Sequence, residues 1–162
     1  MQTTKLYYKT KLAVVRDAKV EDVFELAPNL RLSDINEIWK SHHRTAEDAL
    51  LYEYTHSIIC LTIEHNEKPV GMFGIVPLTI TGNTATIWLL ASPGLEQIQR
   101  AFLKHSRYFI NLMLSFYPIL ENYVDINNTQ SIRWLKWCRA EIGPVVPYGI
   151  EQAPFQYFTF KR

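Results

Sequence analysis

The sequence predicts a mixed α/β fold, with helices on both faces of one central sheet. Short runs of β-branched and aromatic residues alternate with segments of helical periodicity along the chain. In the middle of the chain, strand-like runs follow one another across polar turns, which is typical of antiparallel pairing. A later strand-like run, ILENYVDI, has a helical segment on either side, and such crossovers indicate that part of the sheet is parallel.

Length and composition indicate a single globular domain. The chain has 162 residues, which we assign to one domain with a polar lead-in at 1–11. Seventeen Lys and Arg balance sixteen Asp and Glu, so bulk charge favours neither a nucleic acid nor an anionic membrane as partner. The chain contains neither a signal peptide nor an apolar run of about 18 residues, so we expect no membrane span and a cytoplasmic protein.

The first part of the chain predicts one strand and two short helices. The strand covers 11–18, and the helical spacing of VEDVFELA continues from it to residue 27. Pro28 interrupts that helix, and Ser33 is the expected N-cap of the next one, at 34–41. The residues expected to share the inner face of this second helix are Ile35, Ile38 and Trp39.

A third helix and three strands come next. Thr45 is the expected N-cap of a helix at 46–56. The strands are expected at 57–64, 69–80 and 84–92, with polar turns between them. The first two strands should form a hairpin.

The last third of the chain predicts a long helix followed by strand, helix and hairpin. An amphipathic pattern extends over 95–117 and ends at a proline. A strand at 119–126 then passes through two asparagines into a helix at 129–138, and 143–161 form a closing hairpin. Asn127 or Asn128 is the expected N-cap of that helix.

This order of elements, together with the stretch YVDINNTQSIRWLKWCRAEIG, resembles the GNAT superfamily of acyl-CoA-dependent N-acyltransferases. The superfamily pattern of an Asn after the fifth strand, followed by a small residue and an Ile, corresponds to Asn128, Ser131 and Ile132. The longer stretch FLKHSRYFINLMLSFYPILENYVDINNTQSIRWLKW resembles GNAT-like proteins of tailed bacteriophages, one of which is an internal virion protein of short-tailed phages. The resemblance implies a GNAT-like fold and a phage protein in the host cytoplasm or in the virion.

The resemblance also implies a binding site for acetyl-CoA. Its pyrophosphate would lie on the stretch ASPGLEQIQRAF, which has a single glycine and an acidic residue, Glu96, in the first helical turn. The alternative is that Ser92 and Gly94 only cap the helix and that Asn128 is only an N-cap. The expected cofactor-binding residues are Leu90, Ser92, Gly94, Arg100, Asn128 and Ser131.

Candidate catalytic residues lie on the strand at 119–126. Glu121, Tyr123 and Asp125 alternate along it, so they share one face, where a buried carboxylate could accept the proton of an amine. The tyrosine that usually acts as general acid in the superfamily is replaced by Leu135. The alternative is that these residues are solvated side chains without a catalytic role.

The loop before the third helix supplies the candidate substrate contacts. In a GNAT arrangement His42, His43 and Glu47 would border the acceptor groove. Adjacent histidines point in different directions and no other ligand stands at metal-binding spacing, so we expect a polar loop and no metal.

These observations leave two functions open. The first is an acetyl-CoA-dependent N-acetyltransferase with a weak or degenerate catalytic site, acting on an amine acceptor. The second is a non-catalytic virion or assembly protein that binds phage structural proteins, with Tyr148 and Phe155 as an exposed partner surface.

Overall fold

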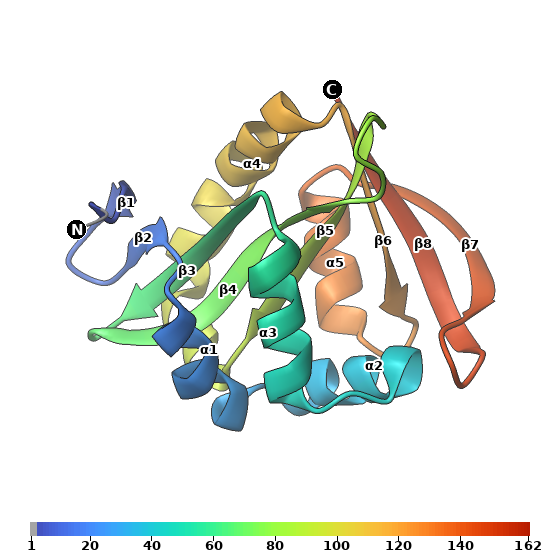
Figure 1. The fold of residues 1–162 in the computed structure, drawn as a ribbon, viewed down its shortest axis with the longest axis horizontal. Coiled ribbons are helices and arrows are strands. Elements are labelled where there is room, and N and C mark those ends of the chain that lie inside the picture. Colours follow the sequence, from blue (N-terminus) through green and yellow to red (C-terminus); the bar gives the residue numbers. More distant parts are fainter. Residues whose placement is uncertain (1–2) are drawn as a thin grey trace.

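The computed structural model describes residues 3–162, which form an eight-stranded mixed sheet with helices on both faces (Figure 1). The strand order is β1-β2-β3-β4-β5-β6-β8-β7, and neighbouring strands are antiparallel except for β5 and β6, which are parallel. The strands are β1 (Leu6–Lys9), β2 (Val14–Asp17), β3 (Ile59–His65), β4 (Lys68–Pro77), β5 (Thr84–Ala91), β6 (Ile119–Asp125), β7 (Glu141–Tyr148) and β8 (Ala153–Lys161).

The helices divide between the two faces of the sheet. Helices α1 and α3 pack against β4 on the face that is in front in Figure 1, with α2 to their right, whereas α4 and α5 lie behind the sheet. The helices are α1 (Val20–Leu26), η1 (Ala27–Asn29), α2 (Leu32–His42), α3 (Ala46–His56), η2 (Pro93–Ile98), α4 (Gln99–Phe116) and α5 (Thr129–Trp137). In the described part of the chain, no helix is long and apolar enough to cross a membrane.

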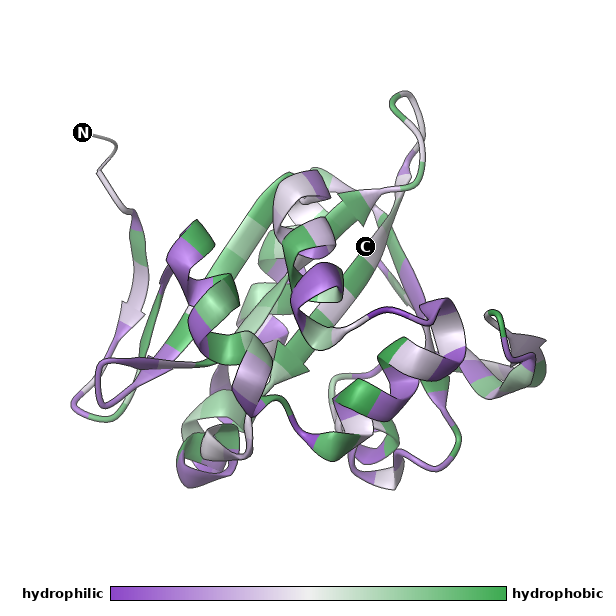
Figure 2. Cartoon of the chain, turned by 60° about the horizontal axis from the view of Figure 1, so that its bottom comes forward, coloured by the Kyte–Doolittle hydropathy of each residue, from purple (hydrophilic) through white to green (hydrophobic). Residues whose placement is uncertain are grey.

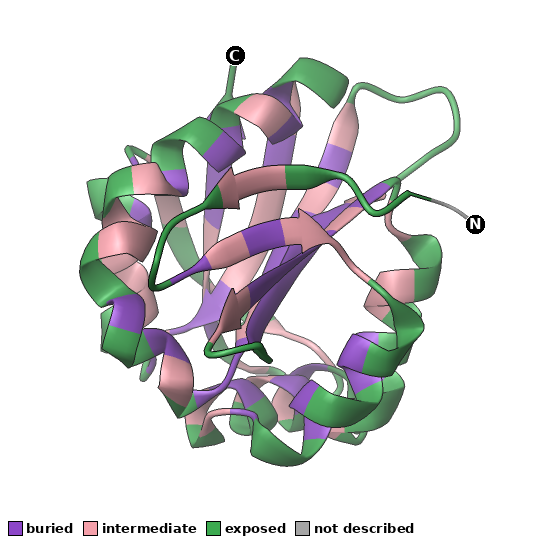
Figure 3. Cartoon of the chain, turned by 90° about the vertical axis from the view of Figure 1, so that its left-hand side faces the viewer, coloured by how far each residue is buried: buried purple, intermediate pink, exposed green. Residues whose placement is uncertain are grey.

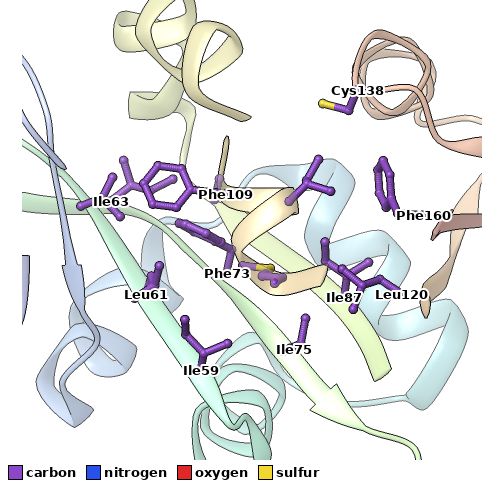
Figure 4. Packing of buried hydrophobic residues seen from close by; sticks show 14 of the residues in the cluster. Ile59, Leu61, Ile63, Phe73, Ile75, Ile87, Phe109, Leu120, Cys138 and Phe160 are labelled. Carbon is purple, nitrogen blue, oxygen red and sulfur yellow. The ribbon is translucent and has the colours of Figure 1, made fainter. Parts of the chain in front are cut away.

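Each face of the sheet has its own apolar core. The larger core joins the sheet to α4 and α5, and in it Phe73 of β4 meets Phe109 of α4 edge to face at 5.4 Å (Figure 4). The smaller core joins α1, α2 and α3 to Met72 and Trp88. Apolar residues accordingly follow the central strands in Figure 2, and the buried residues follow the same strands in Figure 3.

Most expected elements are present, with four differences. Thr45 and Asn128 are N-caps as expected, because each side chain accepts a main-chain N–H of the helix that follows. The expected Ser33 cap is wrong, since α2 begins two residues earlier than expected, at Leu32, and its N-cap is Arg31. The long helix begins later than expected, at residue 99, because 93–98 form a 3-10 helix. Strand β1 lies inside the expected lead-in, where Leu6–Lys9 pair with β2. The fourth difference is the orientation of α2, which shapes the candidate site described below.

Candidate functional site

The sheet opens between β5 and β6, and we call this opening the fork. The parallel ladder between the two strands ends at Thr86 and Glu121. Both strands continue further, to Ala91 and Asp125, so their main-chain groups beyond the ladder face an opening instead of each other. Buried main-chain groups need hydrogen-bond partners, and the fork therefore requires them from another part of the chain or from a ligand.

Helix α2 supplies partners on the β5 side of the fork. The Asp34 carboxylate accepts the main-chain N–H of Ala91 at 2.9 Å, and the main-chain N–H of Arg31 donates to the carbonyl of Ala91 at 2.8 Å. The Arg31 guanidinium also donates two hydrogen bonds to the Asp34 carboxylate. The last residue of β5 is thus fully bonded to the start of α2.

One turn further along, α2 supplies partners on the β6 side. Oε1 of Glu37 accepts the main-chain N–H of Asp125 and the side-chain amide of Asn128, both at 3.0 Å. Lys40, again one turn on, pairs with the Asp125 carboxylate. Successive turns of α2 therefore bond first to β5 and then to β6, and the helix lies across the open end of the fork.

The closed end of the fork is bridged by Asn122 of β6. Its side-chain amide donates to the carbonyl of Ile87 at 2.7 Å, and its side-chain oxygen accepts the main-chain N–H of Tyr123 at 2.7 Å. Main-chain groups of Ile87 and Ala91 point into the fork. Because the direction of main-chain N–H and C=O groups alternates from residue to residue along a strand, those of Leu89, midway between the two, also point into the fork. Leu89 is the position at which the edge of β5 remains available to a ligand that carries amide groups.

The orientation of α2 differs from the expected one. Its inner face carries Asp34 and Ser41, which are 2% and 9% exposed, whereas Leu32 and Trp39 on its outer face are 71% and 52% exposed. Of the three residues expected to face inward, Ile38 is buried, but Ile35 is 39% exposed and lies with Trp39 on the outside. Helix α2 therefore turns Asp34 and Ser41 inward and Leu32, Ile35 and Trp39 outward, contrary to the usual amphipathic pattern.

The carboxylates of α2 are hard to ionise in this position. Burial raises the pKa of Glu37 to about 7, although the hydrogen bonds from Asn128 and from the main chain of Asp125 favour its charged form. Burial also raises the pKa of Asp34 above its usual range, against the opposing effect of Arg31. A carboxyl group with a pKa near 7 can accept and release a proton at neutral pH.

Two adjoining cavities meet at the fork. The outer groove has a volume of about 460 Å³ and lies between η2, α4 and α5. The fork cavity has a volume of about 130 Å³ and extends through the sheet to Asp34 and Glu37. The residues that line both cavities are Arg31, Leu89, Phe102, Ser131 and Trp134. An elongated ligand in the outer groove would thus have its end directed toward α2.

The residues expected to bind the cofactor separate into two groups. Ser131 lines both cavities. Leu90 packs in the smaller core, Ser92 is buried and accepts the N–H of Gly94 at 3.2 Å, and Arg100 is an exposed residue of α4; none of these four lines either cavity.

The environment of Asn128 shows why it is buried. Its side-chain oxygen accepts the N–H of Ser131 at 3.2 Å as the N-cap of α5, and its amide donates to Glu37. The side chain therefore connects α5 with α2, and both of its polar ends are occupied.

The three candidate catalytic residues of β6 lie on the face of the sheet that carries α1, α2 and α3. Tyr123 lines the fork cavity. The Glu121 carboxylate accepts the phenol O–H of Tyr157 at 2.6 Å, and it does not line the fork cavity. Asp125 is 3% exposed and is paired with Lys40.

The expected substrate contacts lie at the end of α2 and the start of α3, away from both cavities. Nδ1 of His42 is hydrogen-bonded to the Ser41 hydroxyl at 2.8 Å. His43 ends α2 in a left-handed conformation, with φ of 51°, and its Nε2 lies 3.1 Å from the Glu151 carboxylate. Glu47 is exposed in the first turn of α3. In the described residues, no group of three or more His, Cys, Asp or Glu could hold a metal ion.

Sequence reasoning missed the residues that close the fork, namely Asp34, Glu37 and Asn122. A signal for the first two was present, because Asp34, Glu37 and Ser41 repeat at helical spacing and form a polar stripe. The stripe of Leu32, Ile35 and Trp39 repeats equally well, and periodicity alone does not say which stripe faces the sheet.

Comparison of the sequence with known families and proteins gives one match, which covers part of the chain. A family model described as "Bacteriophage T7, probable scaffold protein Gp13" matches residues 70–143. No curated protein matches the chain in sequence.

Solved structures of acetyltransferases are similar to the chain over nearly its whole length. An acetyltransferase of the GNAT family from Bacillus anthracis has a TM-score of 0.69 at 11% identity, covering 97% of this chain and 98% of that one. The ribosomal-protein-S5-alanine acetyltransferase from Vibrio fischeri has a TM-score of 0.68 at 10% identity, covering 97% and 96%. Spermidine N-acetyltransferase from Vibrio cholerae, in complex with CoA and spermine, has a TM-score of 0.61 at 13% identity, covering 94% and 96%. The chain therefore has the GNAT acetyltransferase fold, as its sequence predicted.

Proposed function

We propose that the chain is a phage-encoded protein that binds acetyl-CoA or a related acyl-CoA in the outer groove and transfers its acyl group weakly to an amine. The observation that carries this proposal is the junction of the two cavities, which leads from the outer groove through the fork to Glu37. The solved structures of similar fold support it, because they are acetyltransferases and one of them is a complex with CoA and spermine.

The inner part of the site fits the arm of CoA. This arm is an extended chain with amide groups, and Leu89 offers a strand edge that can pair with amides. Phe102 and Trp134, stacked with their ring centroids 5.4 Å apart, provide apolar walls beside it. Leu89 and Ser131 would hold the arm where the outer groove meets the fork.

The outer part of the site fits the phosphates of CoA less well. Arg133 is exposed and lines the groove, so it can pair with a phosphate. Glu96 lines the same groove, and its carboxylate opposes a phosphate at the start of η2. The N–H of Gly94 is already bonded to Ser92. The proposed site therefore has weak affinity.

Residues around the fork would accept and donate the protons that move during acyl transfer. Bound acyl-CoA supplies an activated thioester carbonyl. Oε2 of Glu37 would accept the proton that the amine loses as its nitrogen bonds to that carbonyl, because the pKa of Glu37 is about 7. The usual acid position, Leu135, is buried in the larger core, so the phenol of Tyr123, which lines the fork cavity, would protonate the departing sulfur. The occupied hydrogen bonds of α2 would slow this reaction.

Calorimetric titration with CoA and acetyl-CoA tests the binding step. We expect saturable binding that Arg133→Gln weakens about tenfold, since one charge-assisted contact is worth about that factor. Lys136→Gln is the matched control, because Lys136 is an exposed cation on the same helix that does not line the groove. No binding of either compound at millimolar concentration, or equal losses in the two variants, would refute the proposal.

A second function, in virion assembly without catalysis, is favoured by two observations. The family model that matches residues 70–143 describes a phage scaffold protein. The outer face of α2 exposes Leu32, Ile35 and Trp39, and exposed apolar groups of this kind are typical of partner surfaces. The expected exposed partner surface in the last hairpin is wrong for Phe155, which is only 1% exposed, and Tyr148 is half-buried, with its ring stacked on that of Tyr123.

Analysis of particles from an infection tests this second function. If the outer face of α2 binds a structural protein, Trp39→Lys should lower the amount of the chain in particles or assembly intermediates. Glu37→Gln, on the opposite face of the same helix, should leave that amount unchanged. A requirement for Glu37 but not for Trp39 would contradict the assembly function.

A further inference from the structure

A row of aromatic rings lies on the α2 and α3 side of the sheet, beside the fork. Tyr123 and Tyr148 stack almost parallel, with their centroids 4.1 Å apart and their planes inclined by 13°. Tyr157 is 5.3 Å from Tyr123, and Phe155 is 5.2 Å from Tyr148. The three tyrosines are half-buried, so a small ligand can reach the row. Tyr123 connects the row to the fork cavity, which it also lines.

Two carboxyl groups act on this row without an ion-pair partner: Glu121 is hydrogen-bonded to Tyr157, and the charge of Glu53 raises the pKa of Tyr148. In residues 3–162, neither Glu121 nor Glu53 forms an ion pair with Lys or Arg. Among the described residues, the Glu121 carboxylate is hydrogen-bonded only to the Tyr157 phenol, at 2.6 Å. Glu53 of α3 has a buried oxygen, Oε2, that finds no hydrogen-bond partner in the described part of the chain. A buried polar atom without a partner is costly and points to an unfilled contact.

The electrostatics of the row are consistently negative. Burial raises the pKa of Glu53 to about 7. Burial and the Glu121 carboxylate together raise the pKa of Tyr157 to about 12, and burial, Tyr123 and Glu53 raise the pKa of Tyr148. Each of these groups resists gaining negative charge, so each would be stabilised by a cation placed beside it.

Two cations at the end of α2 and just after it, Lys40 and Arg44, are engaged elsewhere. Lys40 is paired with Asp125. Arg44, whose charge acts on Glu53, lies over the ring of Tyr52, with its guanidinium carbon 4.5 Å from the ring centroid. Within residues 3–162, the row therefore combines aromatic rings with carboxylates that form no ion pair, and aromatic rings and carboxylates together bind organic ammonium groups.

We propose that Tyr123, Tyr148, Glu53 and Glu121 form a binding site for a primary ammonium group, and that this group is the acyl acceptor. The role as acceptor rests on the proposed function, whereas the binding of the cation does not. The ammonium would lie against the tyrosine rings between the two carboxylates, next to the fork. There the amine nitrogen, once deprotonated, lies on the same side of the sheet as Glu37.

Titration of the whole chain with amines, in the absence of any acyl-CoA, tests the site. The probes are Nα-acetyl-lysine amide and 1,4-diaminobutane, which represent a protein side chain and a free polyamine. Their neutral counterparts, acetylated on the amino groups, are the matched controls. We expect the ammonium compounds to bind and the acetylated ones to bind at least about tenfold more weakly, because the charge-assisted contacts are lost. The ammonium probe that binds more tightly indicates whether the acceptor is a protein side chain or a free polyamine.

Variants assign the binding to these residues. Glu53→Gln and Glu121→Gln should each weaken amine binding about tenfold, whereas Glu25→Gln, an exposed change on α1, should not. Circular dichroism of each variant checks that it is folded. Equal binding of charged and acetylated probes, or equal effects of all three variants, would overturn the site. Amine binding without any CoA binding would support the site and overturn the acyltransferase function instead.

Discussion

The substitution Glu37→Gln should have opposite effects on stability and on activity. Gln keeps the side-chain oxygen that accepts the N–H groups of Asp125 and Asn128. It removes the carboxyl group, and with it both the cost of a buried charge and the capacity to accept a proton. If Glu37 serves the fork as a base, the variant should be more stable and less active at pH 8.

The pKa of Glu37 sets the size and the sign of the effect on stability. Its pKa rises from 4.5 to about 7 on folding. Between these values the folded chain binds more protons than the unfolded chain, so the free energy of unfolding falls as the pH rises through this window. The full difference would be about 3 kcal/mol. Water reaches the half-buried side chain and screens part of it, so we expect about 1–3 kcal/mol at pH 8 and almost none at pH 4.5.

Urea unfolding of the two chains between pH 4.5 and pH 8 measures this difference. Glu53 titrates in the same window, because burial also raises its pKa to about 7. Glu53 is present in both chains, so its contribution cancels when one curve is subtracted from the other. The difference curve should therefore rise with pH between about 4.5 and 7 and level off above pH 7. Amine-dependent release of CoA, followed on the same samples, should fall by about 10²-fold or more, the range of general-base catalysis.

Two results would refute this reasoning. A variant that is equally stable or less stable at pH 8 would mean that Glu37 is not buried as a costly charge. A variant that is more stable but releases CoA at the original rate would mean that the base is another group. Asp125→Asn then becomes the informative variant, because Asp125 is the other carboxylate that α2 contacts in the fork.

Two further predictions concern the connections of α2. Asn128→Ser should keep the N-cap of α5 and lose only the amide that donates to Glu37, so the pKa of Glu37 should rise further, which titration followed by NMR measures. Asn128→Ala also removes the N-cap, so its free energy of unfolding should be about 1 kcal/mol lower than that of Asn128→Ser. Gly149→Ala should destabilise the chain by at least about 1 kcal/mol in urea unfolding, because Gly149 has φ of 73° and a Cβ there would lie 2.4 Å from Cα of Ser41. An unchanged pKa of Glu37 in the first case, or an unchanged midpoint in the second, would contradict these contacts.

The sequence predicted the elements that depend on local chemistry. The caps at Thr45 and Asn128 follow from side chains that accept a nearby main-chain N–H, and such bonds involve only neighbouring residues. The hairpin between β3 and β4 follows from a polar turn between two apolar runs, and its turn residues Asn66 and Glu67 have positive φ. The mixed sheet follows from the order of the elements, because connection rules leave few alternatives.

The candidate site could be predicted only in part. Strand alternation predicts Tyr123 and the family pattern predicts Ser131, because both signals act at fixed spacing; both residues line the fork cavity, and their roles there stay predictions. Asn122 was missed because its role depends on where β5 and β6 separate, which is a property of two distant segments. Leu90 was chosen in place of Leu89 for the same reason, since the register of the fork decides which residue of β5 faces it.

The orientation of α2 is explained by the fork and not by packing. Turning Leu32 and Trp39 into water while enclosing Asp34 and Glu37 forfeits apolar burial and adds the cost of poorly solvated charge. The unpaired main-chain groups of β5 and β6 offset part of this cost, because a carboxylate is a strong acceptor for an N–H. They do not explain Glu37 itself, since a Gln at this position would accept the same two hydrogen bonds without a charge. A group that titrates near pH 7 therefore costs stability at the inner end of the fork cavity, which is expected of a residue kept for its proton.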